Sequence, residues 1–166
     1  MDRRTLLKAG VALGFGLLAK ALGRRPAHAK EPKKMFEVTK TDAEWRAMLT
    51  PAQYRVLRQE GTEPPFQNEY HANKAKGVYR CAGCELPLFS SEAKYESRTG
   101  WPSFWQPIAA SAIGTRSDWN LLRPRTEVHC ARCGGHLGHV FDDGPQPTGL
   151  RYCMNSAALT FVPAQA

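Results

Sequence analysis

The chain has 166 residues, which is enough for one domain with a hydrophobic core and too few for two domains of ordinary size. Its formal net charge of +8 would favour a nucleic-acid or membrane surface if the whole chain shared it. Residues 1–29, however, hold six of the 23 Lys and Arg and one of the 15 Asp and Glu, a net charge of +5. The remainder carries only +3. With 42% hydrophobic residues, 14 Gly and 12 Pro, the chain has the composition of a turn-rich globular protein and not of a disordered chain or a helical bundle.

The first 29 residues have the composition of an export signal. A charged start over residues 1–8 precedes an apolar stretch over residues 9–19, and Ala27-His28-Ala29 has the small residues of a cleavage site. The opening, with Arg3 and Arg4, resembles the twin-arginine signal that directs folded proteins across a membrane. An uncleaved membrane anchor is the alternative, but 11 apolar residues at about 1.5 Å each do not span a hydrocarbon core of ~30 Å. We therefore expect a cleaved signal, an exported or periplasmic product, and no permanent membrane span.

The mature chain begins with a charged, Pro-containing segment over residues 30–36, which we expect to be a flexible lead-in to a domain over residues 37–166. Thr41 with Glu44, and Thr50 with Gln53, have capping-box spacing, and these predict two short helices, the second ending near Glu60. After Gly61 the sequence changes to short runs rich in Val, Tyr, Phe, Ile and Leu between turn residues. The pattern predicts a mainly β body, with its most strand-like segments at 77–80, 126–129, 150–153 and 159–162.

Four of the five cysteines form two C-x-x-C knuckles, Cys81 with Cys84 and Cys130 with Cys133. Each knuckle can place two thiolates on one side of a tetrahedral Zn²⁺, and two knuckles complete the site. Their separation indicates that the metal joins two hairpins of a larger sheet. Two disulfides are the alternative for an exported protein. If export follows folding, zinc can be bound in the cytosol first, so we expect one structural zinc per chain.

Cys153 is left without a partner, and an odd cysteine in an exported chain needs an explanation. It could be a buried structural residue, because a free cysteine packs as a small hydrophobe. Against this, Arg151 lies two residues away on a predicted strand and so faces the same side, where its charge can lower the thiol pKa. Local spacing alone does not decide between the two roles.

Two further segments each allow both a structural and a functional interpretation. His136 and His139 stand in a Gly-rich run before a turn at Asp143, and they could be catalytic, structural, or supports of the nearby metal site. The segment around Trp101 and Phe104 is rich in aromatic residues and contains a proline, which makes a central strand improbable on sequence grounds. These aromatic residues could pack in the core or bind a small apolar substrate group.

Six separate motifs stand in a fixed order: Gly61 to Phe66, Cys81 with Cys84, Gly100 to Phe104, Cys130 with Cys133, His136 to Phe141, and Arg151 to Ser156. In this order they resemble the B-type methionine sulfoxide reductases, over about residues 37–162. The resemblance implies two antiparallel sheets with small flanking helices and a shallow site for the R epimer of methionine sulfoxide. We expect the substrate to be methionine sulfoxide within oxidised proteins and the enzyme to be a monomer. The resemblance also implies Cys153 as the nucleophile and His139 as the acid, with Trp101 against the substrate methyl group. We expect Phe104 to line the substrate site beside Trp101. The residues that complete the implied site are His136, Asp143, Arg151 and Asn155.

These roles agree with the chemistry that sulfoxide reduction needs. A thiolate must attack the sulfoxide sulfur while the oxygen gains protons, and the thiolate is left as a sulfenic acid. Many members place a second redox cysteine just before Gly100, where this chain has Thr99, so we expect an external thiol, such as a thioredoxin-like protein, to regenerate Cys153. Residues 117–125 also differ from the family pattern, so the contacts of that stretch cannot be inferred from the resemblance.

The competing interpretation is a zinc-knuckle module that binds nucleic acid or protein without catalysis. The export signal and the small charge of the mature chain both count against it, so we expect no nucleic-acid partner.

Overall fold

The computed structural model describes residues 36–119 and 124–165. The predicted export signal and nearly all of the lead-in lie outside the described residues. Within the described part of the chain, no helix is long and apolar enough to cross a membrane.

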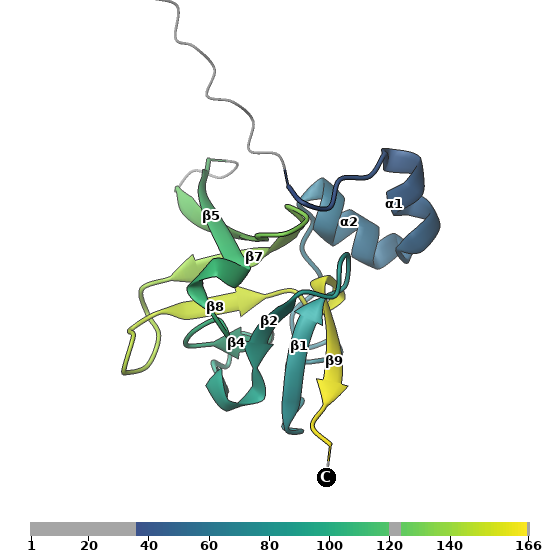
Figure 1. Cartoon of the computed structure of the whole chain (residues 1–166). Coiled ribbons are helices and arrows are strands. Elements are labelled where there is room, and N and C mark those ends of the chain that lie inside the picture. Colours follow the sequence, from purple (N-terminus) through teal and green to yellow (C-terminus); the bar gives the residue numbers. More distant parts are fainter. Residues whose placement is uncertain (1–35, 120–123, 166) are drawn as a thin grey trace, which may run out of the picture. The chain divides into compact units, whose positions relative to one another are not determined.

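Two short helices open the domain, as predicted. Helix α1 spans Asp42–Met48 and α2 spans Pro51–Gln59, and each begins with a complete capping box in which the N-cap threonine and the third helical residue bond each other's backbone. Helix α2 ends at Glu60, which adopts a left-handed conformation with φ 56°. The buried side chains of α2 face strand β7 and the turn η3, so the helix covers the region where the two sheets meet (Figure 1).

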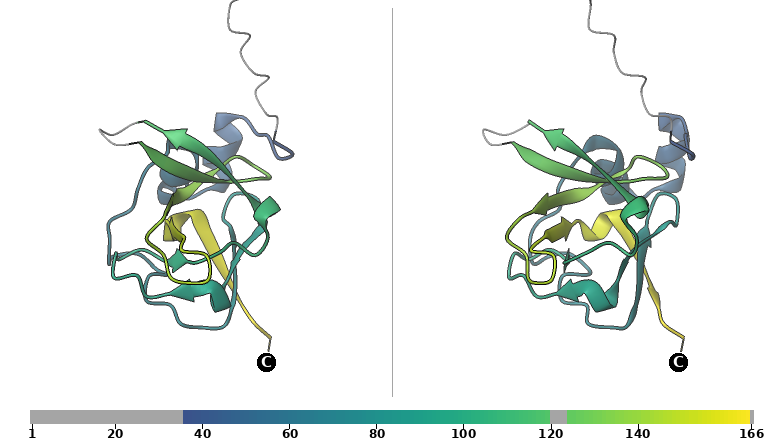
Figure 2. Two further views of the ribbon diagram at one scale, coloured as in Figure 1. Left: turned by 90° about the vertical axis from the view of Figure 1, so that its left-hand side faces the viewer. Right: turned by 60° about the vertical axis from the view of Figure 1, so that its left-hand side comes forward.

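The body consists of two antiparallel sheets, which confirms the predicted fold class (Figures 1 and 2). The smaller sheet has the order β2-β1-β9, and the larger has the order β3-β4-β8-β7-β6-β5. The strands of the smaller sheet are β1 (Gly77–Cys81), β2 (Pro87–Ser90) and β9 (Leu159–Pro163). Those of the larger are β3 (Lys94–Tyr95), β4 (Ser103–Phe104), β5 (Ile113–Asp118), β6 (Arg125–Cys130), β7 (His136–Phe141) and β8 (Arg151–Met154). Single turns of 3-10 helix, η1 (Ser91–Ala93), η2 (Ala110–Ala112) and η3 (Ser156–Ala158), stand between some of them.

The core between the sheets is aromatic. Phe104 has no exposed surface and stacks on Phe89 at 4.5 Å between ring centroids, while Tyr79 meets it edge-on at 5.1 Å. The structure thus places Phe104 in the core instead of in a substrate-binding wall. The reason is the alternation of a strand, because Ser103 and Phe104 are consecutive residues of β4 and point to opposite faces of the sheet.

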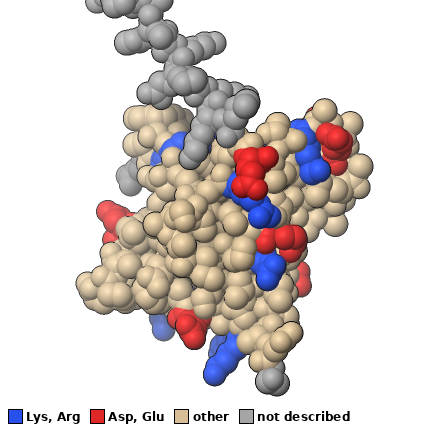
Figure 3. Space-filling model, in the orientation of Figure 1, with Lys and Arg blue, Asp and Glu red and all other residues tan. Residues whose placement is uncertain are grey.

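Charges of both signs lie close together on the surface. On the face shown in Figure 3, Lys and Arg occur in small groups beside Asp and Glu. On α1, for example, Arg46 forms an ion pair with Asp42, with 2.7 Å between nitrogen and oxygen. Mixed groups of this kind are typical of a solvated surface.

Candidate active site

The four knuckle cysteines form one cluster at the tips of two hairpins. Cys81 ends β1 and Cys84 lies in the turn that follows, while Cys130 ends β6 and Cys133 lies in the β6–β7 turn. The sulfur atoms of Cys81 and Cys133 are 3.6 Å apart, those of Cys84 and Cys130 are 3.5 Å apart, and all four lie within 4.8 Å of one another. These separations exclude disulfides, whose sulfur atoms are ~2.05 Å apart. They suit a tetrahedral ion with bonds of about 2.3 Å, for which the sulfur–sulfur edge is about 3.8 Å.

This cluster joins two different sheets. The sequence predicted a metal between two hairpins of one larger sheet, but β1 and β2 belong to the three-stranded sheet, whereas β6 and β7 belong to the six-stranded one. A metal ion held there would fix the β6–β7 turn against the other half of the domain.

One row of paired residues crosses the six-stranded sheet and includes both Cys153 and His139. Cys153 on β8 is paired with Ser103 on β4 and with His139 on β7. Because directly paired residues of antiparallel strands face the same side, their side chains are neighbours. The full row is Tyr95, Ser103, Cys153, His139, Glu127 and Arg116.

A small pocket of about 110 Å³ opens above the middle of this row. Trp101 forms one wall, and its indole nitrogen donates to the carbonyl oxygen of Glu63 at 3.0 Å. Asn155 accepts from the backbone N–H of Glu63 at 3.1 Å and donates to the carbonyl oxygen of Leu137 at 3.1 Å. Asn155 therefore ties the segment that holds Trp101 to the strand that carries His139. The residues lining the pocket are Thr62, Trp101, Arg125, Gly138, His139, Phe141, Cys153, Met154 and Asn155.

Glu63 reinforces this connection through its side chain. Its carboxylate accepts from the backbone N–H groups of Ser156 and Ala157, which follow Cys153 by three and four residues in the chain. Burial raises the pKa of Glu63, and the two N–H bonds oppose that rise. The Glu63 carboxylate thus helps to fix the position of Trp101, and no local sequence pattern indicated this role.

The environment of Cys153 makes it a thiol at rest. Burial raises its pKa, while the Thr99 hydroxyl and the Arg151 charge pull the pKa down without cancelling the rise. Arg151 lowers the thiol pKa, as its position in the sequence predicts, but burial outweighs that effect. The Thr99 oxygen lies 3.9 Å from the Cys153 sulfur, so the two side chains are in contact.

The two histidines occupy different positions. His139 lines the pocket, and its Nε2 lies 2.7 Å from the carboxylate of Asp118. Burial lowers the pKa of His139, and the bond to Asp118 opposes that change. His136 lies behind it, 3% exposed, with its Nδ1 at 2.8 Å from Glu127. His136 therefore supports the row, while His139 faces the pocket.

Arg151 and Asp143 form a pair beside the pocket. The guanidinium donates two hydrogen bonds to the Asp143 carboxylate, at 2.8 and 2.7 Å, and lies over the Phe141 ring at 4.3 Å. These contacts hold the Arg151 guanidinium near Cys153, consistent with the lowering effect of Arg151 on the thiol pKa. Asp143 itself is largely exposed and acts through the arginine.

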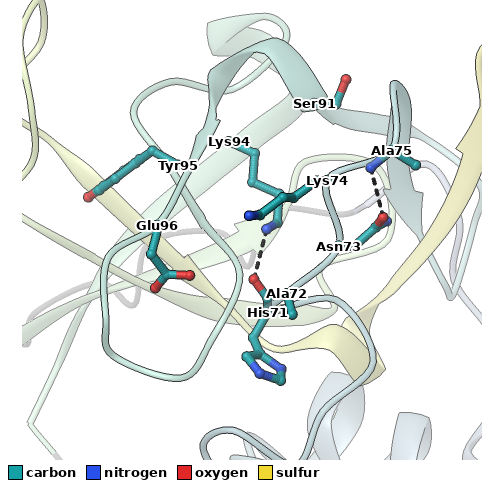
Figure 4. Close-up of a pocket in the computed structure, with 9 residues that line it drawn as sticks. All are labelled: His71, Ala72, Asn73, Lys74, Ala75, Ser91, Lys94, Tyr95 and Glu96. Carbon is teal, nitrogen blue, oxygen red and sulfur yellow. Dashed lines mark hydrogen bonds between the residues drawn. The ribbon is translucent and has the colours of Figure 1, made fainter.

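A second hollow of about 260 Å³ lies at the junction of the 71–75 loop with strand β3 (Figure 4). Lys94 reaches into it and donates to the carbonyl oxygen of His71 at 2.9 Å. This hollow contains no cysteine and none of the residues of the pocket above Cys153.

Comparison with known proteins decides the family. The model of the SelR domain matches residues 49–163. The chain is 59% identical over 124 residues to the peptide methionine sulfoxide reductase MsrB of Thiobacillus denitrificans, covering 75% of this chain and 94% of that protein. It is 55% identical over 126 residues to the protein of the same name from Leptospira interrogans, covering 76% and 96%. This chain belongs to the SelR family.

Some site residues of this SelR protein were not found from sequence. Asp118 and Arg125 lie within the stretch that differs from the family pattern, Glu127 carried no local signal, and Ser103 lies in a motif that assigned it no role. Only the strand register shows that these residues lie near Cys153 and the two histidines.

The pKa of Cys153 leads to a test on the SelR protein without substrate. We expect the rate of iodoacetamide modification at Cys153, followed by peptide mass spectrometry, to rise with a midpoint above the ordinary thiol value of 9.0. Arg151→Leu should move this midpoint higher, because the thiolate loses a neighbouring cation. Arg46→Leu is the matched control, since Arg46 also bonds an aspartate and covers an aromatic ring, but on α1. A lower midpoint in Arg151→Leu would contradict this account of the site.

Proposed function

We propose that this protein reduces the R epimer of methionine sulfoxide in oxidised proteins, with Cys153 as the nucleophile. The observation that carries the proposal is the pairing of Cys153 with His139 under a pocket walled by Trp101. A thiol, an imidazole and an apolar ring meet there, and these are the groups that attack on sulfur, protonation of oxygen and binding of a methyl group require. The names of the relatives support this choice.

In the proposed reaction the Cys153 sulfur attacks the sulfoxide sulfur while His139 supplies a proton to the oxygen. Methionine leaves and the oxygen stays on Cys153 as sulfenic acid, so the substrate sulfur gains two electrons and the Cys153 sulfur loses two. The proton that the thiol loses balances the proton that the oxygen gains. The small volume of the pocket limits the bound group to the sulfoxide and its methyl.

The metal held by the four-cysteine cluster is proposed to be Zn²⁺. Four thiolates in a tetrahedron are typical of structural zinc, which binds no substrate because it has no open coordination position. Zinc here would stabilise the fold by fixing two turns, and it takes no part in the reaction at Cys153.

Two cysteine variants separate catalysis from metal binding. With purified R and S epimers and dithiothreitol, we expect turnover of the R epimer alone, and Cys153→Ser should abolish it while zinc content and melting temperature stay unchanged. Cys84→Ser should instead lower zinc content and melting temperature together, since structural zinc contributes directly to folding. Full activity of Cys153→Ser, or a wild-type preference for the S epimer, would refute the proposal.

Regeneration is proposed to depend on an external thiol. Thr99 touches Cys153 but cannot form a disulfide, and the other four cysteines are gathered in the metal cluster. The sulfenic acid therefore persists until a separate thiol attacks it, and a thioredoxin-like protein is a suitable source.

Wild-type protein mixed with substrate and no reductant should give one equivalent of methionine and one trapped sulfenic acid at Cys153. Thr99→Cys should convert this intermediate into a disulfide with Cys153, because the side chains at the two positions are already in contact. Ser91→Cys, which places a thiol in the separate hollow at β3, is the control and should leave the sulfenic acid in place. A disulfide between Cys153 and a knuckle cysteine in the wild type would contradict this route.

Residues 1–29 are proposed to export the folded enzyme through the twin-arginine route. The paired Arg3 and Arg4, the apolar stretch and Ala27-His28-Ala29 support this. In a bacterial host we expect an exported product whose N-terminus is Lys30, and Arg3→Lys with Arg4→Lys should retain the full chain inside the cell. An unprocessed N-terminus in both proteins would argue against an export signal.

A further inference from the structure

His139 is held from the side by a pair of charged residues on neighbouring strands. Its Nε2 lies 2.7 Å from Oδ2 of Asp118, and Nη2 of Arg125 donates to the same oxygen at 2.7 Å. Asp118 is at the end of β5 and Arg125 at the start of β6, where the two residues are paired. The side chains of Asp118 and His139 are 9% and 11% exposed, so water competes little for this bond.

We infer that Asp118 is a positioning residue that fixes the tautomer of His139, with its proton on Nε2, so that Nδ1 serves the reaction at Cys153. This inference rests on the proposed function. A carboxylate only accepts hydrogen bonds, so the ring nitrogen that faces it must carry a proton. In a neutral imidazole the other nitrogen then has a free lone pair, and it can take a proton from a neighbouring thiol.

At rest, Cys153 carries a proton that must be removed before attack, and a free lone pair on Nδ1 of His139 can accept it. Burial raises the pKa of Cys153 and lowers that of His139, so the resting pair is a thiol beside a neutral imidazole. The Cys153 proton moves to Nδ1, the thiolate attacks the sulfoxide sulfur, and Nδ1 returns the proton to the sulfoxide oxygen. No proton is gained or lost overall, while two electrons pass from the Cys153 sulfur to the substrate sulfur.

The other carboxylate beside His139 is occupied elsewhere. Glu127 is paired with His139 in the register, but it bonds Nδ1 of His136 and the guanidinium of Arg116. Asp118 is therefore the carboxylate that orients His139. The charged and titratable groups packed around the imidazole are Asp118 from β5, Arg125 and Glu127 from β6, His136 from β7 and Cys153 from β8.

Asp118→Leu tests the inference, because it removes the oxygen that accepts from Nε2, and the imidazole proton is then no longer held on that nitrogen. In long-range ¹H–¹⁵N NMR spectra we expect His139 to be protonated on Nε2 in the wild type and to populate the Nδ1 tautomer in the variant. The rate of methionine formation in a single turnover should fall about 10²- to 10⁴-fold, with KM within about threefold of the wild type. Asp118→Glu retains the carboxylate and should recover part of the rate with the wild-type tautomer.

Asp142→Asn is the matched control, because it removes the same charge from an exposed residue next to the site and should change neither the tautomer nor the rate. The NMR measurement needs no substrate, so an inactive wild type would contradict the proposed function alone. An unchanged tautomer in Asp118→Leu would overturn the role of Asp118 whatever the activity. Equal rates in the wild type and Asp118→Leu would overturn it as well.

Discussion

The register of strand β8 between β4 and β7 is the constraint on which the site depends. It places Cys153 between Ser103 and His139 on one face of the sheet. A slip by one residue would turn Cys153 to the opposite face, because side chains alternate along a strand. Gly138 secures the register, since a Cβ atom there would lie 2.1 Å from the carbonyl oxygen of Cys153. The four-cysteine cluster at the β6–β7 turn fixes the start of β7 from the other side.

Burial keeps Cys153 in the thiol form, which reacts slowly. A thiol whose pKa is raised resists alkylation and oxidation at rest, because the thiolate is the species that reacts. Two arginines, each bonded to an aspartate, stand on either side: Arg151 with Asp143 and Arg125 with Asp118. Activation can therefore come from proton transfer between groups that already touch the pocket, and not from a permanently ionised cysteine.

Features with short-range causes could be predicted from the sequence, and features set by strand pairing could not. The helix starts follow from capping boxes within four residues, and the metal cluster follows from two local C-x-x-C turns. Phe104 was misplaced because its direction depends on which face of β4 carries Ser103, and that is set by pairing with a strand about 50 residues away. The net pKa of Cys153 depends on burial, which the neighbouring Arg151 does not reveal.

Hydroxyl groups next to Cys153 bear on how the proposed reaction can end in a sulfenic acid without a second redox cysteine. Ser97 contacts both Thr99 and Ser103, at 2.8 and 2.7 Å between oxygens, and Thr99 reaches the Cys153 sulfur. Hydroxyl groups can donate to an oxidised sulfur and its oxygen, yet they cannot reduce it. Under the proposed mechanism the sulfenic acid is thus held by hydrogen bonds on the inner side, while the pocket leaves its other side open to an incoming thiol. A cysteine at position 99 would make reduction internal; threonine there makes it depend on a second protein or a small thiol.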